Sequence, residues 1–383
     1  MKPKFGIVSS FDVLCGNATY SEAIANGLGE EFEVSPIDVP VYLQKQYDSA
    51  LLRQVVRSIK ECEYINIQLE LGLYGPTPSA AVRALRHIIR SCENFSVTMH
   101  RVDEPPKSLM RQIFDSIKSG KFRSSVKTAI FWCKARLVAN AYAKLVNEVV
   151  SRGGVFIVHT EREKRRIERI NESAKIQVYP ILWPNVPQSV VDLRSKFKTD
   201  SPIVGLFGFV TPYKNYEIVA EGLAEQPFNI LIAGGVHPQS PSYGKNSSNS
   251  SLSYIRKISN LFSRHEYKGR VFFFTSPSDT ELIQLVQSVD IVCVPYLETG
   301  QSGSGIASMA IQYGRKVVFS DNACTRELLH FLNRAPILFD VDSPLGLACA
   351  IRGVHESAER VDFVGYDFSG LLDLYKEASG CHS

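Results

Sequence analysis

A glycine- and serine-rich turn between two apolar segments is the part of the sequence that best suits phosphate binding. Residues 294–314 read VPYLETGQSGSGIASMAIQYG, with a strand expected to end at Pro295 and a helix expected from about 304 to 313. Backbone N–H groups of such a turn and the positive end of the helix dipole converge on one point. Ser302 and Ser304 add hydroxyl donors. The alternative is a loop whose serine only caps the helix. The spacing is neither a Walker loop nor a G-x-G-x-x-G fingerprint, which argues against nicotinamide dinucleotides.

A second turn of similar character lies earlier in the same half of the chain. Residues 205–215 read GLFGFVTPYKN, which places Lys214 near the start of the next helix. A helix N-terminus is already positive, so a lysine there is unfavourable unless an anion is present. The alternative is an exposed, solubilising lysine. Two such turns on one sheet together predict a nucleotide-diphosphate site.

Polar residues also follow three apolar strands of the N-terminal half. They are the turn at Gly16–Tyr20, the run Gln68–Gly75, and His100 with Arg101 and Asp103. Because parallel strands end at the same sheet edge, these groups are expected to share one crevice for a small polar ligand. A lone histidine is often structural, and His159 is a competing candidate in a similar position.

The elements that position these residues alternate between short apolar strands and helical periods, which is typical of an α/β fold with parallel sheets covered on both faces. The alternation breaks at the proline-rich stretch 180–187, so we expect a boundary at about 184–200. Two doubly wound domains, 1–185 and 200–365, would face each other across a cleft, with 236–253 as a surface loop. The expected strands are Phe5–Ser9, Glu33–Ile37, Tyr64–Gln68, Phe95–His100, Val155–His159, Ile203–Phe209, Phe228–Ala233, Val271–Thr275, Asp290–Pro295 and Lys316–Ser320.

Composition narrows the class of protein. The chain has 383 residues, 44% of them hydrophobic, and a net charge of only +4, which excludes a disordered chain and argues against a dedicated nucleic-acid binder. Neither a membrane-spanning run nor a secretory signal is seen. The eight cysteines form no C-x-x-C pair, so neither a zinc site nor disulfide bonds are expected. Reduced cysteines predict a cytoplasmic location.

One stretch departs from this average charge. Between Lys107 and Lys144 there are nine basic residues and one acid, with aromatic residues interleaved. Such a composition is typical of helices on anionic membrane surfaces, which predicts a peripheral location on the inner face of a membrane. The alternative is a solvated helix face with a buried aromatic stripe.

These motifs, in this order, resemble the retaining glycosyltransferases of family 4. The resemblance rests on Gly16–Tyr20, the Gln68–Gly75 run, the strand end at His100, residues 208–214 and residues 295–320. It implies the GT-B fold, with two Rossmann-like domains, a sugar nucleotide on the C-terminal domain and an acceptor approached from the N-terminal one. It also implies that a last helix, at about 366–380, packs back on the first domain.

The resemblance implies roles for individual residues. Lys214 matches the lysine that contacts the donor diphosphate, His100 the histidine that meets the transferred sugar, and Gly16 the glycine loop near the phosphates. The sequence departs from the family's E-x7-E motif, where it has Gln301 and Met309. The implied catalytic residues are His100, Lys214 and Glu298; the implied donor-binding residues are Gly16, Asn17, Gly208, Lys214, Gln301, Ser302, Gly303, Ser304, Gly305 and Glu327; Gln68, Glu70 and Arg101 are expected on the acceptor side.

The expected activity is transfer of a sugar from a nucleotide-diphosphate sugar, UDP- or GDP-linked, to a glycan or lipid-linked acceptor in polysaccharide or glycoconjugate biosynthesis. Configuration would be retained and no metal or other cofactor required. The lone Asp-x-Asp, at Asp340 and Asp342, is expected to be a turn. The alternatives are a non-catalytic sugar-nucleotide-binding relative, suggested by Gln301 and Met309, and an epimerase or inverting transferase on the same fold.

Overall fold

The chain folds into two compact units in this computed structural model. One comprises Met1–Val13, Tyr20–Tyr179 and Ser369–Ser383, and the other Leu14–Thr19 and Pro180–Phe368. We call them unit 1 and unit 2. The structure describes residues 2–11, 16–106, 108, 124–184, 193–235, 251–263, 267–298, 303–356 and 360–381.

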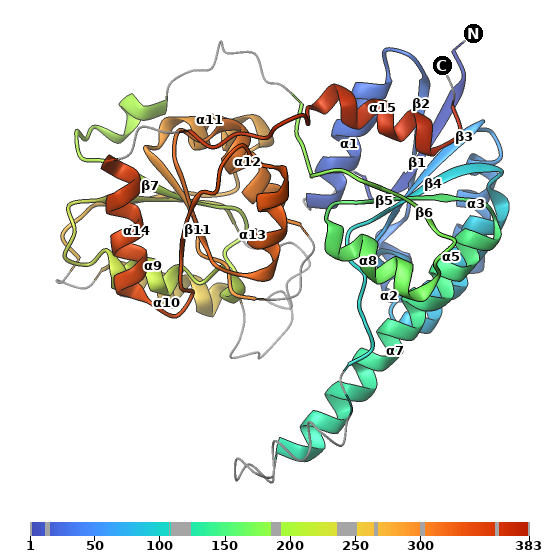
Figure 1. Ribbon diagram of the computed structural model, residues 1–383, viewed down its shortest axis with the longest axis horizontal. Coiled ribbons are helices and arrows are strands. Elements are labelled where there is room, and N and C mark those ends of the chain that lie inside the picture. Colours follow the sequence, from blue (N-terminus) through green and yellow to red (C-terminus); the bar gives the residue numbers. More distant parts are fainter. Residues whose placement is uncertain are drawn as a thin grey trace. The chain divides into compact units, whose positions relative to one another are not determined.

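Unit 1 is built on a parallel sheet of six strands in the order β2-β1-β3-β4-β5-β6. In Figure 1 its helices flank both faces of this sheet. The strands are β1 Lys4–Ser9, β2 Glu33–Asp38, β3 Tyr64–Leu69, β4 Asn94–Met99, β5 Val155–Val158 and β6 Lys175–Val178; the helices are α1 Gly16–Leu28, α2 Val41–Lys45, α3 Ser49–Ile59, α4 Leu71–Tyr74, α5 Pro78–Ser91, α7 Ser124–Ser151, α8 Glu161–Ile170 and α15 Phe368–Ala378.

The sequence explains where these elements lie. The inner strands are continuously buried, as strands covered by helices on both faces must be. The only proline within these strands, Pro36, is in β2 at the sheet edge, where its missing N–H breaks no ladder. Helix α5 begins with Thr77 capping the N–H of Ala80 and Pro78 in its first turn.

Unit 2 repeats the plan with a second parallel six-stranded sheet, in the order β12-β11-β10-β7-β8-β9. Helices again flank both faces (Figure 1). The strands are β7 Ile203–Phe207, β8 Asn229–Ala233, β9 Val271–Phe274, β10 Ile291–Val294, β11 Val317–Ser320 and β12 Ile337–Phe339; the helices are η1 Leu193–Phe197, η2 Pro212–Lys214, α9 Tyr216–Gly222, α10 Ser251–Phe262, α11 Asp279–Ser288, α12 Gly305–Tyr313, α13 Ala323–Leu328, η4 Leu329–Phe331 and α14 Pro344–Glu356.

The strand orders fix where each sheet can bind a ligand. In unit 2, β7 is hydrogen-bonded to β8 on one side and to β10 on the other. The strands that follow β8 and β10 lie in opposite directions along the sheet, so the strand order reverses between β7 and β10. In unit 1 the same reversal falls between β1 and β3. Ligands of open α/β sheets bind at such switch points, beyond the carboxyl ends of the strands. The residues after β7 and β10, and those after β1 and β3, are therefore the ones to inspect.

Helix α15 returns to the first sheet from the far end of the chain, since its Tyr375 lies 307 residues after Gln68 and 277 residues after Thr98. Its Tyr375 hydroxyl lies 3.1 Å from Gln68 Nε2 in β3 and 3.0 Å from Thr98 Oγ1 in β4. In Figure 1 the helix, in red, lies among the blue elements of unit 1. The side chains of Tyr375 and Ser379 are buried there.

Several predicted elements differ in detail from the structure. Residues Gly16–Tyr20, expected as a turn, form the first turns of α1, and residues 71–74 form the short helix α4. The predicted loop 236–253 ends in α10, which begins at Ser251; the rest of it lies outside the described residues. The short strands β6 and β12 were not predicted, because each has only three or four residues and is not continuously buried.

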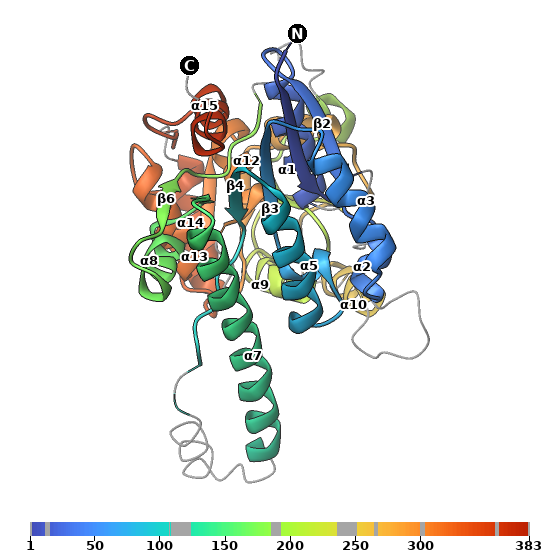
Figure 2. The same cartoon turned by 90° about the vertical axis from the view of Figure 1, so that its right-hand side faces the viewer.

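Helix α7 is the longest helix of the described chain. Its second half packs against α5 and α8, and in Figure 2 its first half extends beyond the body of unit 1. Among the residues that the structure describes, no helix is both long and apolar enough to cross a bilayer.

Candidate functional site

The candidate donor site in unit 2 is organised around a buried lysine at the β7–β10 switch point. Lys214 ends η2 and is 3% exposed, so the alternative of a surface lysine is wrong. Its Nζ donates to the Phe207 carbonyl at 2.9 Å and to the Tyr296 hydroxyl at 2.6 Å. Burial lowers the pKa of Lys214 to about 7. Its hydrogen-bond partners are a carbonyl and a hydroxyl, and among the described residues no carboxylate pairs with it. The ammonium is thus held by neutral acceptors alone.

Glycine at position 208 makes room for this ammonium. Gly208 follows β7 with φ of +86°, a conformation that favours glycine. A Cβ placed there would lie 2.6 Å from Lys214 Nζ and 3.1 Å from a side-chain carbon of Ile306 in α12. Gly208, Lys214 and the first turn of α12 therefore occupy one small region.

Tyr296 connects the lysine to the N-terminus of α12. Its hydroxyl accepts from Lys214 and shares a hydrogen bond with the side chain of Ser304. Ser304 also caps α12, because its Oγ accepts from the N–H of Ala307 at 3.2 Å. The predicted helix from 304 to 313 is confirmed. A lysine ammonium, serine hydroxyl and helix N-terminus in one place form an arrangement suited to phosphate oxygens.

A tryptophan from the proline-rich segment holds the start of α12. The Trp183 indole N–H donates to the Gly305 carbonyl at 3.0 Å, and a Cβ on Gly305 would lie 2.9 Å from the indole ring. Gln312 hydrogen-bonds both backbone groups of Trp183. Met309, at one of the positions where the resemblance implies glutamate, is buried in the core of unit 2.

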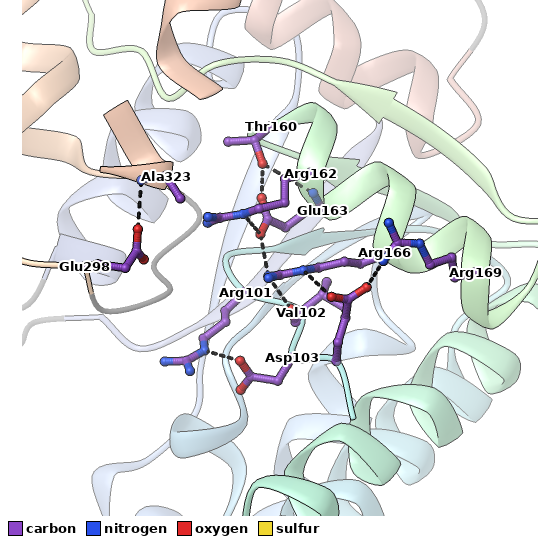
Figure 3. A network of polar contacts seen from close by, with 11 residues as sticks. Arg101, Val102, Asp103, Thr160, Arg162, Glu163, Arg166, Arg169, Glu298 and Ala323 are labelled. Atoms are coloured by element: carbon purple, nitrogen blue, oxygen red, sulfur yellow. Dashed lines mark hydrogen bonds and ion pairs between the residues drawn. The ribbon is translucent and has the colours of Figure 1, made fainter. Parts of the chain in front are cut away.

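The two acidic residues near this turn differ in their roles. Glu298 is exposed, and its Oε2 accepts from the backbone N–H of Ala323 at 2.7 Å, at the start of α13. Figure 3 shows this contact. Asn322 caps the same helix. Glu327 is half-buried near the end of α13. The structure thus gives Glu298 a helix-capping contact, and its catalytic role stays a prediction.

In unit 1 the polar residues predicted after β3 and β4 come together. Gln68 lies in β3 rather than after it and is fully buried; its Oε1 is 2.7 Å from His100 Nε2. Gln68 Nε2 donates to Asn66 Oδ1 at 2.7 Å and to the Tyr375 hydroxyl at 3.1 Å. Because the amide nitrogen of Gln68 donates to Asn66 and Tyr375, the atom that faces His100 is the amide oxygen, which can only accept. The His100 proton therefore lies on Nε2.

Two histidines share this buried group of side chains. The His100 and His159 rings are 5.3 Å apart, and Tyr20 from α1 meets both edge-on. Burial, and then the neighbouring His159, lower the pKa of His100 to about 3; burial lowers the pKa of His159 to about 4. Both are neutral at physiological pH. His100 is therefore suited to hydrogen-bond a neutral sugar hydroxyl rather than to act as an acid.

One ring nitrogen of His159 is an unused hydrogen-bond acceptor among the described residues. Its Nδ1 is 3.0 Å from the Tyr179 carbonyl and must carry the proton, and its Nε2 is buried with no hydrogen-bond partner within the described part of the chain. An imidazole nitrogen in this state is an acceptor for a hydroxyl donor. Both candidate histidines, which the sequence left as competitors, are thus present in one cluster.

A network of charged residues holds the segment that follows β4. The buried Glu163 carboxylate lies 3.2 Å from Arg166 and 3.4 Å from Arg162, and it also bonds Thr160, the residue that caps α8. Arg166 donates to the Val102 carbonyl at 2.8 Å. Figure 3 shows these contacts converging on the loop after His100. The loop is thereby fixed to α8.

The remaining predicted residues are more exposed. Arg101 pairs with Asp103 at 2.8 Å, beside Glu70 at the start of α4 (Figure 3 draws the Arg101–Asp103 pair). Gly16 opens α1, and a Cβ placed on it would meet nothing within 4 Å; Asn17 is half-buried. Gly303 is half-buried before α12. Gln301 and Ser302 lie outside the described residues.

Within the described ranges no group of three His, Cys, Asp or Glu side chains could hold a metal ion. Asp340 accepts from the N–H of Asp342 at 3.0 Å, which confirms the predicted turn. Tyr296, Trp183 and Tyr375 were not predicted from the sequence. Only the pairing of strands and the return of α15 bring these residues to the sites, and no local pattern marks them.

Comparison with known proteins supports the fold. No protein-family model and no curated sequence matches the chain. Among solved structures, Anabaena Alr3699/HepE in complex with UDP and glucose is 14% identical, covers 97% of this chain and 95% of its own, and has a TM-score of 0.59. Sucrose-phosphate synthase from Thermosynechococcus elongatus is 14% identical over 99% and 93%, with a TM-score of 0.56. An α,α-trehalose-phosphate synthase (UDP-forming) from Burkholderia vietnamiensis is 10% identical over 93% and 91%, with a TM-score of 0.55. The predicted GT-B class, with two Rossmann-like domains, is confirmed.

Proposed function

We propose that the protein is a retaining glycosyltransferase that uses a nucleotide-diphosphate sugar. The observation that carries the proposal is the buried ammonium of Lys214, held at the β7–β10 switch point beside the N-terminus of α12 without a carboxylate partner among the described residues. A buried cation held only by neutral groups is costly, and a diphosphate would supply the missing charge.

The same arrangement suits the chemistry of donor cleavage. Breaking a glycosyl–phosphate bond leaves negative charge on the diphosphate, while the sugar gains oxocarbenium character. Lys214, Ser304 and the α12 dipole are donors fixed in advance where that charge develops. We propose that these groups stabilise the leaving group without a divalent ion, and that a phosphate oxygen accepts the proton of the acceptor. Activity that persists with EDTA would agree with this; activity restored only by added Mg²⁺ or Mn²⁺ would contradict it.

His100 is proposed to contact the transferred sugar or its acceptor, and Gln68 is proposed to position the His100 ring. The His100 imidazole is neutral and donates its Nε2 proton to Gln68, which fixes the orientation of the ring. His159 Nε2 offers an acceptor for a hydroxyl. Neither group is charged at neutral pH, which suits binding to sugar hydroxyls rather than to phosphate.

Related folds suggest which donors to test first. Anabaena HepE has been solved with UDP and with UDP-glucose, and the Burkholderia trehalose-phosphate synthase is described as UDP-forming. We propose a UDP- or GDP-sugar donor and a glycan or lipid-linked acceptor in polysaccharide or glycoconjugate synthesis, as in family 4.

The experiment is donor turnover by wild-type protein and by Lys214→Met. A panel of UDP-, GDP- and ADP-sugars is tested for transfer to added glycans and lipid extracts, and for slow hydrolysis, with NMR of the product anomer to establish retention. Lys214→Met should lose at least about a hundredfold in rate, since a charged donor to the leaving group is removed. The exposed Lys196→Met is the matched control. Equal rates in the two variants would refute the donor site.

A non-catalytic sugar-nucleotide binder is the second candidate, favoured by the burial of Met309 where the resemblance implies a glutamate. It predicts binding of a nucleotide sugar, measured by thermal shift, without turnover under any of these conditions. Release of an epimerised sugar nucleotide would instead identify an epimerase on the same fold, and inversion at the anomeric carbon would identify an inverting transferase.

A further inference from the structure

The first half of α7 carries large apolar side chains that are not covered by unit 1. Ile130, Phe131 and Leu137 are 53%, 70% and 57% exposed. In Figures 1 and 2 this half of the helix extends away from the sheet, whereas the second half lies along α5. The alternative that aromatic residues of this region form a buried stripe is therefore wrong for Phe131.

Two of the exposed side chains, Ile130 and Leu137, continue the stripe by which α7 packs onto unit 1, and Phe131 lies next to Ile130 about 100° further round the helix. Ala141 and Leu145 are buried, and Leu137 stands one turn before Ala141 on the same helix face. Ile130 is seven residues, or two turns, before Leu137. The face of α7 that carries Ile130 and Leu137 thus passes from the protein core to the surface, and with Phe131 beside it this leaves an exposed apolar patch within the described part of the chain.

The two halves of α7 also differ in whether their charged side chains are paired. In the second half, Glu148 lies 2.6 Å from Arg86 and 2.7 Å from Arg90. In the first half, Lys134 and Arg136 are exposed and have no acidic partner among the described residues. Between residues 116 and 147 the sequence has seven basic residues and no acid. The uncovered part of the helix is therefore apolar and uniformly positive.

From this combination we infer that residues 129–137, in the first half of α7, dock on the surface of an anionic phospholipid bilayer. Ile130, Phe131 and Leu137 would enter the boundary between headgroups and acyl chains, while Lys134 and Arg136 face phosphate groups. Arg136 already lies over the Trp132 ring, at 5.7 Å from its centroid, in the manner of an interfacial pair.

Charge favours a bilayer over a second copy of the chain. Two such helices packed together would bring like charges into contact with no acid to neutralise them, which is costly. An anionic surface instead supplies the opposite charge and an apolar interior at once. Membrane docking is tested separately from the proposed activity, because flotation of the protein requires no donor turnover.

The test is flotation of the full-length protein with vesicles. Vesicles of equal parts phosphatidylglycerol and phosphatidylcholine should bind the protein, and binding should fall at high salt; pure phosphatidylcholine vesicles should bind much less. The variant Ile130→Ser/Phe131→Ser/Leu137→Ser should lower the bound-to-free ratio by at least about tenfold. Lys134→Gln/Arg136→Gln should lower it about tenfold.

Matched controls separate this surface from general stickiness. Leu345→Ser/Val364→Ser removes two equally exposed apolar side chains of unit 2, and Arg53→Gln/Lys60→Gln removes two exposed charges at α3. Both should bind vesicles as the wild type does. Failure to float, equal binding to neutral vesicles, or loss in the controls alone would overturn the inference. So would a wild-type dimer that ignores vesicles and becomes monomeric in the triple apolar variant, as measured by light scattering.

Discussion

Lys214 and Tyr296 form a buried pair in which the ammonium donates to the phenol oxygen at 2.6 Å and lies 4.5 Å from the centroid of the same ring. The two residues follow β7 and β10, the strands on either side of the switch point. The tyrosine thus holds the lysine by a hydrogen bond and a cation–π contact together, at the position proposed for the donor diphosphate.

Removing the hydroxyl of Tyr296 should loosen the lysine without altering the fold. In Tyr296→Phe the ring remains, but Nζ keeps only the Phe207 carbonyl as partner. We expect about a tenfold loss in kcat/KM for the donor, the value of one buried hydrogen bond. Tyr216→Phe is the control: it removes another buried hydroxyl, 3.1 Å from the same carbonyl. Equal losses in both variants would mean that core packing, not lysine placement, is responsible.

A methyl group at position 208 should displace the lysine. Gly208→Ala combines a φ of +86° with a Cβ 2.6 Å from Nζ. We expect loss of donor binding by calorimetry, with about 1–3 kcal/mol lower stability from backbone strain. Gly365→Ala has a similar φ of +74° and open space around the new methyl group, so it should lose stability alone. Donor binding by Gly208→Ala at wild-type affinity would contradict the placement.

Donor affinity should weaken as the pH rises through about 7. Burial lowers the pKa of Lys214 to about 7, so the free protein loses this positive charge above that pH. UDP-glucose does not itself titrate at its diphosphate between roughly pH 7 and 9, and a bound diphosphate raises the lysine pKa. The dissociation constant should therefore increase by up to about tenfold per pH unit. In Lys214→Met the dependence should vanish, and a persistent slope would assign it to another group.

Acid should destabilise unit 1 through its two buried histidines. Their pKa values are lowered to about 3 and about 4, whereas an unfolded histidine titrates near about 6.5. Between these values the unfolded chain binds more protons, so the free energy of unfolding falls as the pH falls from about 6.5 toward 4, by up to about 1.4 kcal/mol per pH unit for each histidine.

Hydrogen exchange of β3 and β4 measures this loss directly. His159→Gln should show a shallower pH dependence than the wild type, because one buried titrating group is gone. The matched control is His87→Gln, which removes an exposed histidine outside this buried group. An identical slope in all three proteins would place the acid sensitivity elsewhere.

The sequence predicted the fold class and most strand positions because buried parallel strands are continuous apolar runs. It also predicted the helix that begins near Ser304, and it gave the serine cap that the structure shows only as an alternative to a phosphate-binding turn. It could not predict that Lys214 is buried, since burial depends on Tyr296, which is 82 residues away. Nor could it choose between His100 and His159, because only strand pairing shows that their rings lie 5.3 Å apart.

Two further features were beyond local patterns. The polar core around Gln68 is completed by Tyr375, from a helix 307 residues later in the chain. Short strands such as β12, with three residues, carry too little periodicity to distinguish them from loops.

The return of α15 has a consequence for how the protein is made. When β1 to β6 have been synthesised, the nascent chain still lacks two hydroxyl groups of α15 and the residue that follows it. The Tyr375 hydroxyl is the hydrogen-bond partner of the Gln68 amide, and the Ser379 hydroxyl is the partner of Ser96. Until Tyr375 and Ser379 are synthesised, the side chains of Gln68 and Ser96 are exposed to solvent. Unit 1 can therefore be completed only after the whole of unit 2 has been synthesised. Native-like burial of β3 and β4 is thus one of the last events of biosynthesis. In a chain truncated before α15, the polar side chains of these two strands would stay exposed.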